Sequence, residues 1–209
     1  MIHEWKKSEQ QFYLPKNKPE FITIPKFKFF TIEGTGNPND AFFAEYIRVL
    51  YALSYGIKMS PKKGMKPDGY FDYSVYPLEG VWDLTDEAKK SPDGIFNKND
   101  LVFKLMIRQP EFVDFDFALK ILDYTKKNKA HKLLEKVRFE EIPEGDSIQM
   151  LHQGSYDSEP ESFRCMENFA EKNNYIRISK THREIYLSDA RKVAPEKLKT
   201  VLRFGVLQK

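Results

Sequence analysis

One carboxylate stands where a β-strand rarely carries one. Residues 182–188 read His-Arg-Glu-Ile-Tyr-Leu-Ser, and their alternation predicts a strand with Glu184, His182 and Tyr186 on one face. Because Glu is a poor strand former, Glu184 belongs either to a solvated sheet face or to an aromatic-lined pocket. In such a pocket a carboxylate loses hydration and becomes a stronger base. Glu184 is therefore the candidate catalytic residue.

Aromatic side chains are the candidates for the walls of such a pocket. Trp82 can stack on a planar ligand or pack in a core, and the sequence does not separate the two. Tyr156 follows a glycine turn, where its hydroxyl can point inward or simply pack on the turn. Tyr51 and Tyr55 lie one helical turn apart and either border a cleft or pack on a sheet. Tyr186 shares the face of Glu184.

Other polar residues have simpler interpretations. Glu79 can act as a second carboxylate, although a structural hydrogen-bond acceptor is favoured. His152 is expected to be a packed core histidine. Cys165 falls on the apolar stripe of a predicted helix, which predicts an inert buried thiol. The 4 histidines show no metal-ligand spacing, so we expect no metal and no other cofactor.

The composition narrows the class of protein. The chain has 209 residues, 14% aromatic residues and 34 basic against 31 acidic side chains, for a net charge of +3. That balance argues against a dedicated nucleic-acid binder, which carries a basic stripe. A single cysteine excludes an internal disulfide and fits a reducing compartment. Without a long apolar run or signal-peptide core, a soluble cytoplasmic protein is expected.

The first half of the chain predicts a strand, a helix and two more strands. A strand at 27–33 ends in a glycine turn, and a helix follows from an N-cap at Asn37 to about Tyr55, where Gly56 ends it. Two strand candidates, 70–78 and 101–108, come next.

The second half repeats this order. A strand at 147–153 precedes a helix opened by a capping box of Ser158 and Glu161. The strands 182–188 and 198–206 then follow. Between the halves lie a helix at 115–127 and a strand at 137–142.

This repeat predicts an α+β fold made of duplicated strand-helix-strand-strand modules. The whole chain, 1–209, forms a single domain in this interpretation, with a first module at about 27–110, a connecting helix and strand at about 111–146, and a second module at about 147–209. We expect the modules to be related by a pseudo-two-fold, with a central ligand cleft between them.

Five stretches, in the same order along the chain, resemble signature segments of the GyrI-like small-molecule-binding family. They are Pro77–Trp82, Leu105–Val113, His152–Pro160, His182–Asp189 and Lys197–Arg203. The resemblance implies a duplicated fold with a ligand cleft. It also maps the family glutamate onto Glu184. The ligand-binding candidates are Trp82, Tyr156, Tyr186, Tyr51, Tyr55 and Phe112.

Two positions depart from the family pattern. Asp83 follows Trp82 where many relatives carry a second Trp, and Phe103 stands where an aromatic residue, often Trp, is expected. The first departure changes the polarity or width of one wall of the expected cleft.

The resemblance implies two uses of such a pocket. Some relatives are stand-alone hydrolases that open the cyclopropane ring of spirocyclopropyl-cyclohexadienone DNA alkylators, and here Glu184 would activate a water. Others are effector domains of multidrug-sensing activators, in which an acidic residue holds lipophilic cations. The stand-alone hydrolase is favoured, since we find no helix-turn-helix before Phe27. A partner role toward gyrase rests on the family name alone.

The expected partner is thus a planar aromatic or lipophilic small molecule, with no direct nucleic-acid or membrane contact. A chain that holds both modules can close its own cleft and act as a monomer.

Overall fold

The structure is a computed structural model that describes residues 2–91 and 97–209. The described chain forms two compact units. One comprises the N-terminal end up to His3 together with 27–78 and 82–142, and the other comprises 4–26, 79–81 and 143–209. Each unit is described by itself.

The first unit combines a sheet with two long helices. Its strands are β2 (Phe27–Thr35), β3 (Leu78–Leu84, of which Glu79–Val81 belong to the second unit), β4 (Leu101–Gln109) and β5 (Arg138–Ile142). Its helices are α3 (Ala41–Lys58), α4 (Asp86–Lys89) and α5 (Phe115–Asn128), with 3-10 turns η1 (Ser60–Lys63), η2 (Lys98–Asp100) and η3 (Lys132–Lys136). β2 pairs in antiparallel fashion with both β4 and β5.

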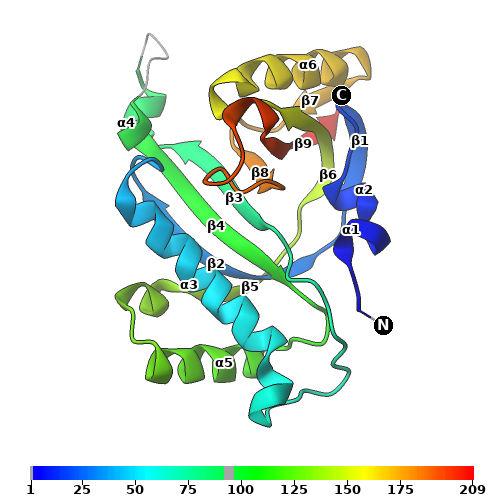
Figure 1. Ribbon diagram of the computed structural model, residues 1–209. Coiled ribbons are helices and arrows are strands. Elements are labelled where there is room, and N and C mark those ends of the chain that lie inside the picture. Colours follow the sequence, from blue (N-terminus) through cyan, green and yellow to red (C-terminus); the bar gives the residue numbers. More distant parts are fainter. Residues whose placement is uncertain (1, 92–96) are drawn as a thin grey trace. The chain divides into compact units, whose positions relative to one another are not determined.

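The core of the first unit lies between α3 and the sheet. The helix α3 packs against α5, β2 and β4 (Figure 1). Its apolar positions recur at helical spacing and bury Leu50, Leu53 and Ile57 completely. The prediction that Gly56 ends this helix is wrong, since α3 continues to Lys58. A Cβ at position 56 would lie 3.0 Å from Cγ2 of Ile121 on α5. The glycine therefore permits close helix packing.

The second unit is an antiparallel sheet covered by one helix. Its strands are β1 (Glu20–Ile24), β6 (Gly145–Gln153), β7 (Tyr175–Arg177), β8 (His182–Tyr186) and β9 (Lys199–Gln208). β9 pairs with β6, β7 and β8, and β1 pairs with β6. The helices are α1 (Trp5–Ser8), α2 (Gln10–Tyr13) and α6 (Glu159–Lys172), with 3-10 turns η4 (Tyr156–Ser158) and η5 (Pro195–Lys197).

The helix α6 covers β6, β7 and β9 (Figure 1). Its apolar stripe, with Met166 and Ala170, packs on Ile148, Leu202 and Phe204 of the sheet, and all five are buried. Cys165 is adjacent in sequence but exposed, so the prediction of a buried thiol is wrong. The helix turns that side chain to solvent because Met166 occupies the contact with the sheet.

The α+β class is confirmed. The order strand, helix, strand, strand occurs as β2, α3, β3 and β4, and again as β6, α6, β8 and β9, with the short β7 added after α6.

The predicted strand at 70–78 is wrong, since β3 begins only at Leu78. The segment before it runs along α3 and is held by side chains. Lys58 donates to the carbonyl of Tyr73 at 2.6 Å, and the hydroxyl of Tyr70 donates to the carbonyl of Lys58 at 2.8 Å. Aromatic residues of this segment contact α3 instead of forming a strand ladder.

Two predicted helix starts also differ. Asp40, not Asn37, precedes the first residue of α3, because the Asn37 side chain accepts from the Asn39 amide and forms a turn of its own. At α6 no capping box forms. The Ser158 hydroxyl donates to the carbonyl of Ser155 at 2.7 Å instead.

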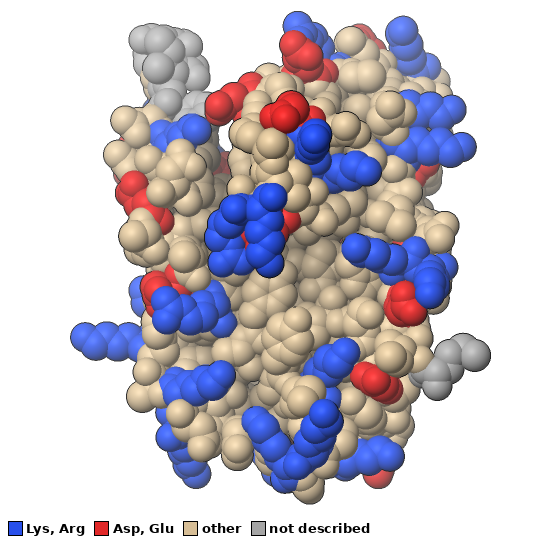
Figure 2. Space-filling model, in the orientation of Figure 1, with Lys and Arg blue, Asp and Glu red and all other residues tan. Residues whose placement is uncertain are grey.

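No helix in the described part of the chain combines the length and apolarity needed to cross a membrane. On the face shown in Figure 2, Lys and Arg side chains form separate groups divided by uncharged surface.

Candidate functional site

Glu184 lies in the middle of β8, opposite Leu202 of β9. The residue is only 8% exposed. Tyr186 donates its hydroxyl to Oε2 of Glu184 at 2.8 Å, and Nε2 of His182 lies 3.1 Å from Oε1. The alternation of the strand thus places all three side chains on one face, as the sequence predicts. This arrangement fixes both oxygens of the carboxylate.

A second carboxyl group, Glu159, meets Glu184. Glu159 is the first residue of α6, is 6% exposed, and forms a side-chain hydrogen bond with Glu184. Burial, the charge of Glu184 and this hydrogen bond raise the pKa of Glu159 to about 10, with Asp157 adding a smaller effect. The positive end of the α6 dipole favours an anion here, but the loss of hydration outweighs it. Glu159 is therefore protonated at neutral pH.

Aromatic rings surround the carboxyl pair. Tyr156 on η4 meets the ring of Tyr186 edge to face, with 6.2 Å between the ring centroids. Phe163 on α6 meets the ring of His182 at 4.6 Å. Tyr156 is 40% exposed, and burial together with Glu184 raises its pKa to about 12, so it remains a hydroxyl donor. One edge of the site is thus an exposed tyrosine.

A histidine holds the turn that carries Tyr156 and leads into Glu159. His152 on β6 is buried, its Nδ1 lies 2.9 Å from the hydroxyl of Ser162, and its Nε2 lies 3.0 Å from the carbonyl of Ser155. The interpretation of His152 as a packed core histidine agrees with this setting. Its role here is to fix η4 against α6.

Gly154 at the start of this turn gives a direct test of its rigidity. Its φ of +146° strains any other residue, and a Cβ would lie 2.8 Å from the Ser158 hydroxyl oxygen. We expect Gly154→Ala to lower the free energy of unfolding by about 1–3 kcal/mol. Urea denaturation measures this, with Gly64→Ala as the matched control. That glycine also has positive φ, at +70°, but nothing lies within 4 Å of its Cβ position. If both variants lost the same free energy of unfolding, the contact with Ser158 would contribute nothing to the cost of Gly154→Ala.

An ion network lies on the other face of β8. Arg183 donates to Oε2 of Glu79 at 2.7 Å and pairs with Glu144 at 3.2 Å. Arg203 of β9 pairs with Glu144 at 3.1 Å and also donates to the carbonyl of Phe12. Glu79 is thus a hydrogen-bond acceptor for a buried guanidinium, in line with the structural role favoured for it.

The protonation of Glu159 makes stability depend on pH. Its pKa is raised from 4.5 to about 10, so the folded protein binds this proton more tightly than the unfolded chain does. The free energy of unfolding therefore falls as the pH rises between these two pKa values. We expect Glu159→Gln to unfold with a free energy about 1–3 kcal/mol higher than wild type near pH 8. Thermal or urea unfolding at pH 5, 7 and 9 should show the gap widening with pH. A gap that is constant with pH would contradict the buried proton.

Comparison with known proteins identifies the family. Residues 17–206 match the model of the GyrI-like small molecule binding domain. The chain belongs to the GyrI-like family. No match was found among curated proteins.

Solved structures agree with this assignment. A hydrolase from Listeria innocua is 33% identical, with 98% of this chain and 100% of that chain covered and a TM-score of 0.87. An uncharacterized conserved protein from Listeria innocua is 34% identical, with the same coverage and a TM-score of 0.88. The EcmrR C-terminal domain, 12% identical with 92% and 98% covered and a TM-score of 0.56, shares the fold.

The predicted site residues of this GyrI-like chain fall into two groups. Glu184, Tyr186 and Tyr156 lie together in the second unit. Trp82, Tyr51, Tyr55 and Phe112 belong to the first unit. Their part in ligand binding stays a prediction.

The first-unit candidates pack in different surroundings. Trp82 is 6% exposed and contacts Phe43 and Phe103, at 5.9 and 5.6 Å between ring centroids. Tyr51 and Tyr55 contact each other at 6.3 Å, and Tyr55 is 52% exposed. Phe112 packs among three aromatic rings, namely Tyr70, Phe71 and Tyr73.

The sequence reasoning missed Glu159, His182 and Phe163 as parts of the site. Glu159 lies inside the stretch that resembles the GyrI-like signature, directly before Pro160. A glutamate in the first turn of a helix has an ordinary explanation in the helix dipole, which hid its contact. His182 could have been found, because it shares the strand face of Glu184.

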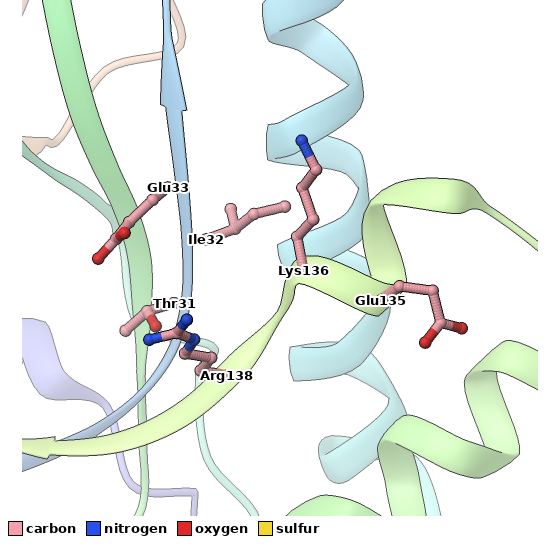
Figure 3. A pocket seen from close by; sticks show the side chains of 6 residues that line it. All are labelled: Thr31, Ile32, Glu33, Glu135, Lys136 and Arg138. Carbon is pink, nitrogen blue, oxygen red and sulfur yellow. The ribbon is translucent and has the colours of Figure 1, made fainter.

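Two further features of the GyrI-like chain lie outside this site. The first unit has a pocket of about 330 Å³ lined by Thr31, Ile32, Glu33, Glu135, Lys136 and Arg138 (Figure 3). Its lining carries charges of both signs and no aromatic wall, so it does not suit a planar apolar ligand. Among the described residues, no group of three or more His, Cys, Asp or Glu side chains could hold a metal ion.

Proposed function

We propose that this protein binds planar, mostly apolar small molecules and hydrolyses the cyclopropane ring of cyclopropanoid DNA-alkylating compounds. The observation that carries this proposal is the buried carboxylate of Glu184, which contacts Tyr186, His182 and Glu159. A carboxylate has about four acceptor positions. Among the residues that the structure describes, Tyr186, His182 and Glu159 occupy three of these positions on Glu184. One position is left for a water.

The reaction needs one base and an acceptor for charge. Glu184 takes a proton from the bound water as its oxygen attacks the least hindered cyclopropane carbon. The strained C–C bond breaks, and its electron pair passes into the conjugated ring, whose carbonyl oxygen becomes a phenolate. Tyr156, which keeps its hydroxyl proton, is placed at the edge of the site where it can donate to a developing oxyanion.

One comparison and one chemical argument support this assignment. A hydrolase from Listeria innocua is 33% identical to the chain, with 98% of this chain covered. The chemistry described requires no metal or cofactor, since strain in the substrate supplies driving force. In this proposal the protein works in the cytoplasm, as a monomer, on compounds that would otherwise alkylate DNA.

The second candidate function is binding without chemistry. An ionised carboxylate beside Tyr156 and Tyr186 also suits a flat lipophilic cation, which gains from charge and from contact with the ring faces. This alternative describes a protein that sequesters or senses drugs. It predicts saturable binding and no product.

The deciding experiment is incubation with a spirocyclopropyl-cyclohexadienone compound in ¹⁸O-labelled water, followed by mass spectrometry. Hydrolysis predicts a product heavier than the substrate by one labelled water, formed faster than in buffer and in more than stoichiometric amount. Binding measured by fluorescence, with the substrate recovered unchanged, would overturn the hydrolase and leave the second candidate.

A further inference from the structure

Two buried carboxyl groups meet at one hydrogen bond in the second unit. Glu159 and Glu184 are 6% and 8% exposed, and a side-chain hydrogen bond joins them. Ionised carboxylates offer only acceptors, so this bond requires a proton on one of the two groups. The pair therefore carries one negative charge and one proton.

The surroundings decide which group holds the proton. Glu184 accepts the Tyr186 hydroxyl at 2.8 Å and faces His182 at 3.1 Å, and such donors stabilise an ionised carboxylate. Glu159 has no comparable support: its Oε1 is buried and has no hydrogen-bond partner among the described residues. Asp157, two residues before Glu159, adds repulsion against a second charge. The proton belongs on Glu159.

We propose that Glu159 is a positioning residue that donates a retained proton to Glu184 and thereby fixes the orientation of the buried, ionised base. Its part in turnover rests on the proposed function. In the reaction the water proton passes to Glu184, the cyclopropane electron pair passes to the phenolate, and the proton on Glu159 stays where it is. Release of the proton from Glu184 to the phenolate or to solvent restores the pair with one charge.

Other titratable groups lie near the pair on η4, on β8 and on the segment after β8. They are Asp157 and Tyr156 on η4, His182 and Tyr186 on β8, and Asp189, which acts on Tyr156 from the segment after β8. None of them is a cation fixed by an ion pair with Glu159. A second negative charge on the pair would therefore go uncompensated.

Infrared spectroscopy tests the proton without any substrate. At pH 8, where surface carboxyl groups are ionised, wild type should show the C=O stretch of one protonated carboxylic acid. Glu159→Gln should abolish this band, because the amide carries no such group. The matched control is Glu161→Gln, which changes an exposed glutamate on the same helix and should leave the band unchanged. Absence of the band in wild type, or its persistence in Glu159→Gln, would overturn the proposal.

Turnover tests the positioning. Glu159→Ala removes the donor and should lower kcat about tenfold or more, whereas Glu159→Gln should restore most of it, because its amide N–H can donate the same hydrogen bond. KM should change little, since Glu159 does not touch the substrate. Equal kcat in Glu159→Ala and wild type would contradict the positioning role.

The two readouts separate this inference from the proposed function. The infrared band depends only on the folded protein. If wild type shows the band but no hydrolysis, the proposed function fails while the shared proton stands. If hydrolysis is present and the band is absent, the hydrolase stands and the positioning role of Glu159 is wrong.

Discussion

Glu184→Gln should lower the rate of cyclopropanoid hydrolysis at least about 100-fold, because general-base catalysis contributes on the order of 10²–10⁴ in rate. The amide has the shape of the carboxylate and still accepts from Tyr186, which is 2.8 Å from Oε2 in wild type. It cannot, however, take a proton from water. We therefore expect kcat to fall while the affinity for an uncharged substrate changes little. Single-turnover kinetics with product mass measures the first, and equilibrium fluorescence binding measures the second.

A matched control separates loss of the base from general damage. Glu33→Gln changes another strand glutamate, on β2 of the first unit, whose side chain is 61% exposed. It should retain wild-type turnover. Full turnover in Glu184→Gln with an intact fold would remove Glu184 as the base. Loss of affinity for a lipophilic cation, with no product from wild type, would assign Glu184 the role of a counter-ion.

The strand β8 shows how far a single sequence can go. Its alternation correctly places His182, Glu184 and Tyr186 on one face, because side-chain direction in a strand has a fixed period of two. The poor strand propensity of Glu then marks Glu184 as unusual. Local rules suffice here because all three residues belong to one element.

Glu159 could not be found in this way. Its partner Glu184 lies on another element, and only the packing of α6 against the sheet brings the two together. The predicted capping box at Ser158 is wrong for a related reason. The sequence matches a capping box, but the Ser158 hydroxyl donates to the carbonyl of Ser155 and lies 3.2 Å from Nε2 of His152. Helix-capping rules describe a helix end that is open to solvent, whereas the 3-10 turn η4 leads directly into the first residue of α6.

The same limit explains the predicted strand at 70–78. A segment rich in aromatic residues fits a strand, yet Tyr73 and Tyr76 are both buried, with 6.4 Å between their ring centroids, and Lys58 of α3 donates to the carbonyl of Tyr73. The sheet hydrogen bonds begin at Leu78. Whether such a segment pairs in a sheet or packs against a helix depends on tertiary contacts, which the local sequence does not specify.

Arg183→Met should lower the free energy of unfolding by about 3–5 kcal/mol, since it leaves buried carboxylates without their partner. The Arg183 and Glu79 side chains are 7% and 2% exposed, and 2.7 Å separates Nη1 from Oε2. Among the described residues, Glu144 would keep Arg203, at 3.1 Å, as its ion-pair partner. Because Arg183 and Glu184 are adjacent on β8, the loss should also loosen the strand that carries the base. Urea unfolding at pH 7 measures the change.

Two comparisons make this result specific. Arg191→Met removes a guanidinium whose side chain is 81% exposed and which pairs with Asp189 at 2.8 Å, so it should cost at most about 1 kcal/mol. The double variant Glu79→Gln with Arg183→Met should recover part of the loss, because the buried charge that lacks a partner is then gone. If Arg183→Met were no worse than Arg191→Met, the network would be solvated, and β8 would be held by its pairing with β9 and by the buried Ile185 without help from the ion pairs. If the double variant recovers stability but not turnover, the ion network fixes the base and does not only hold the fold.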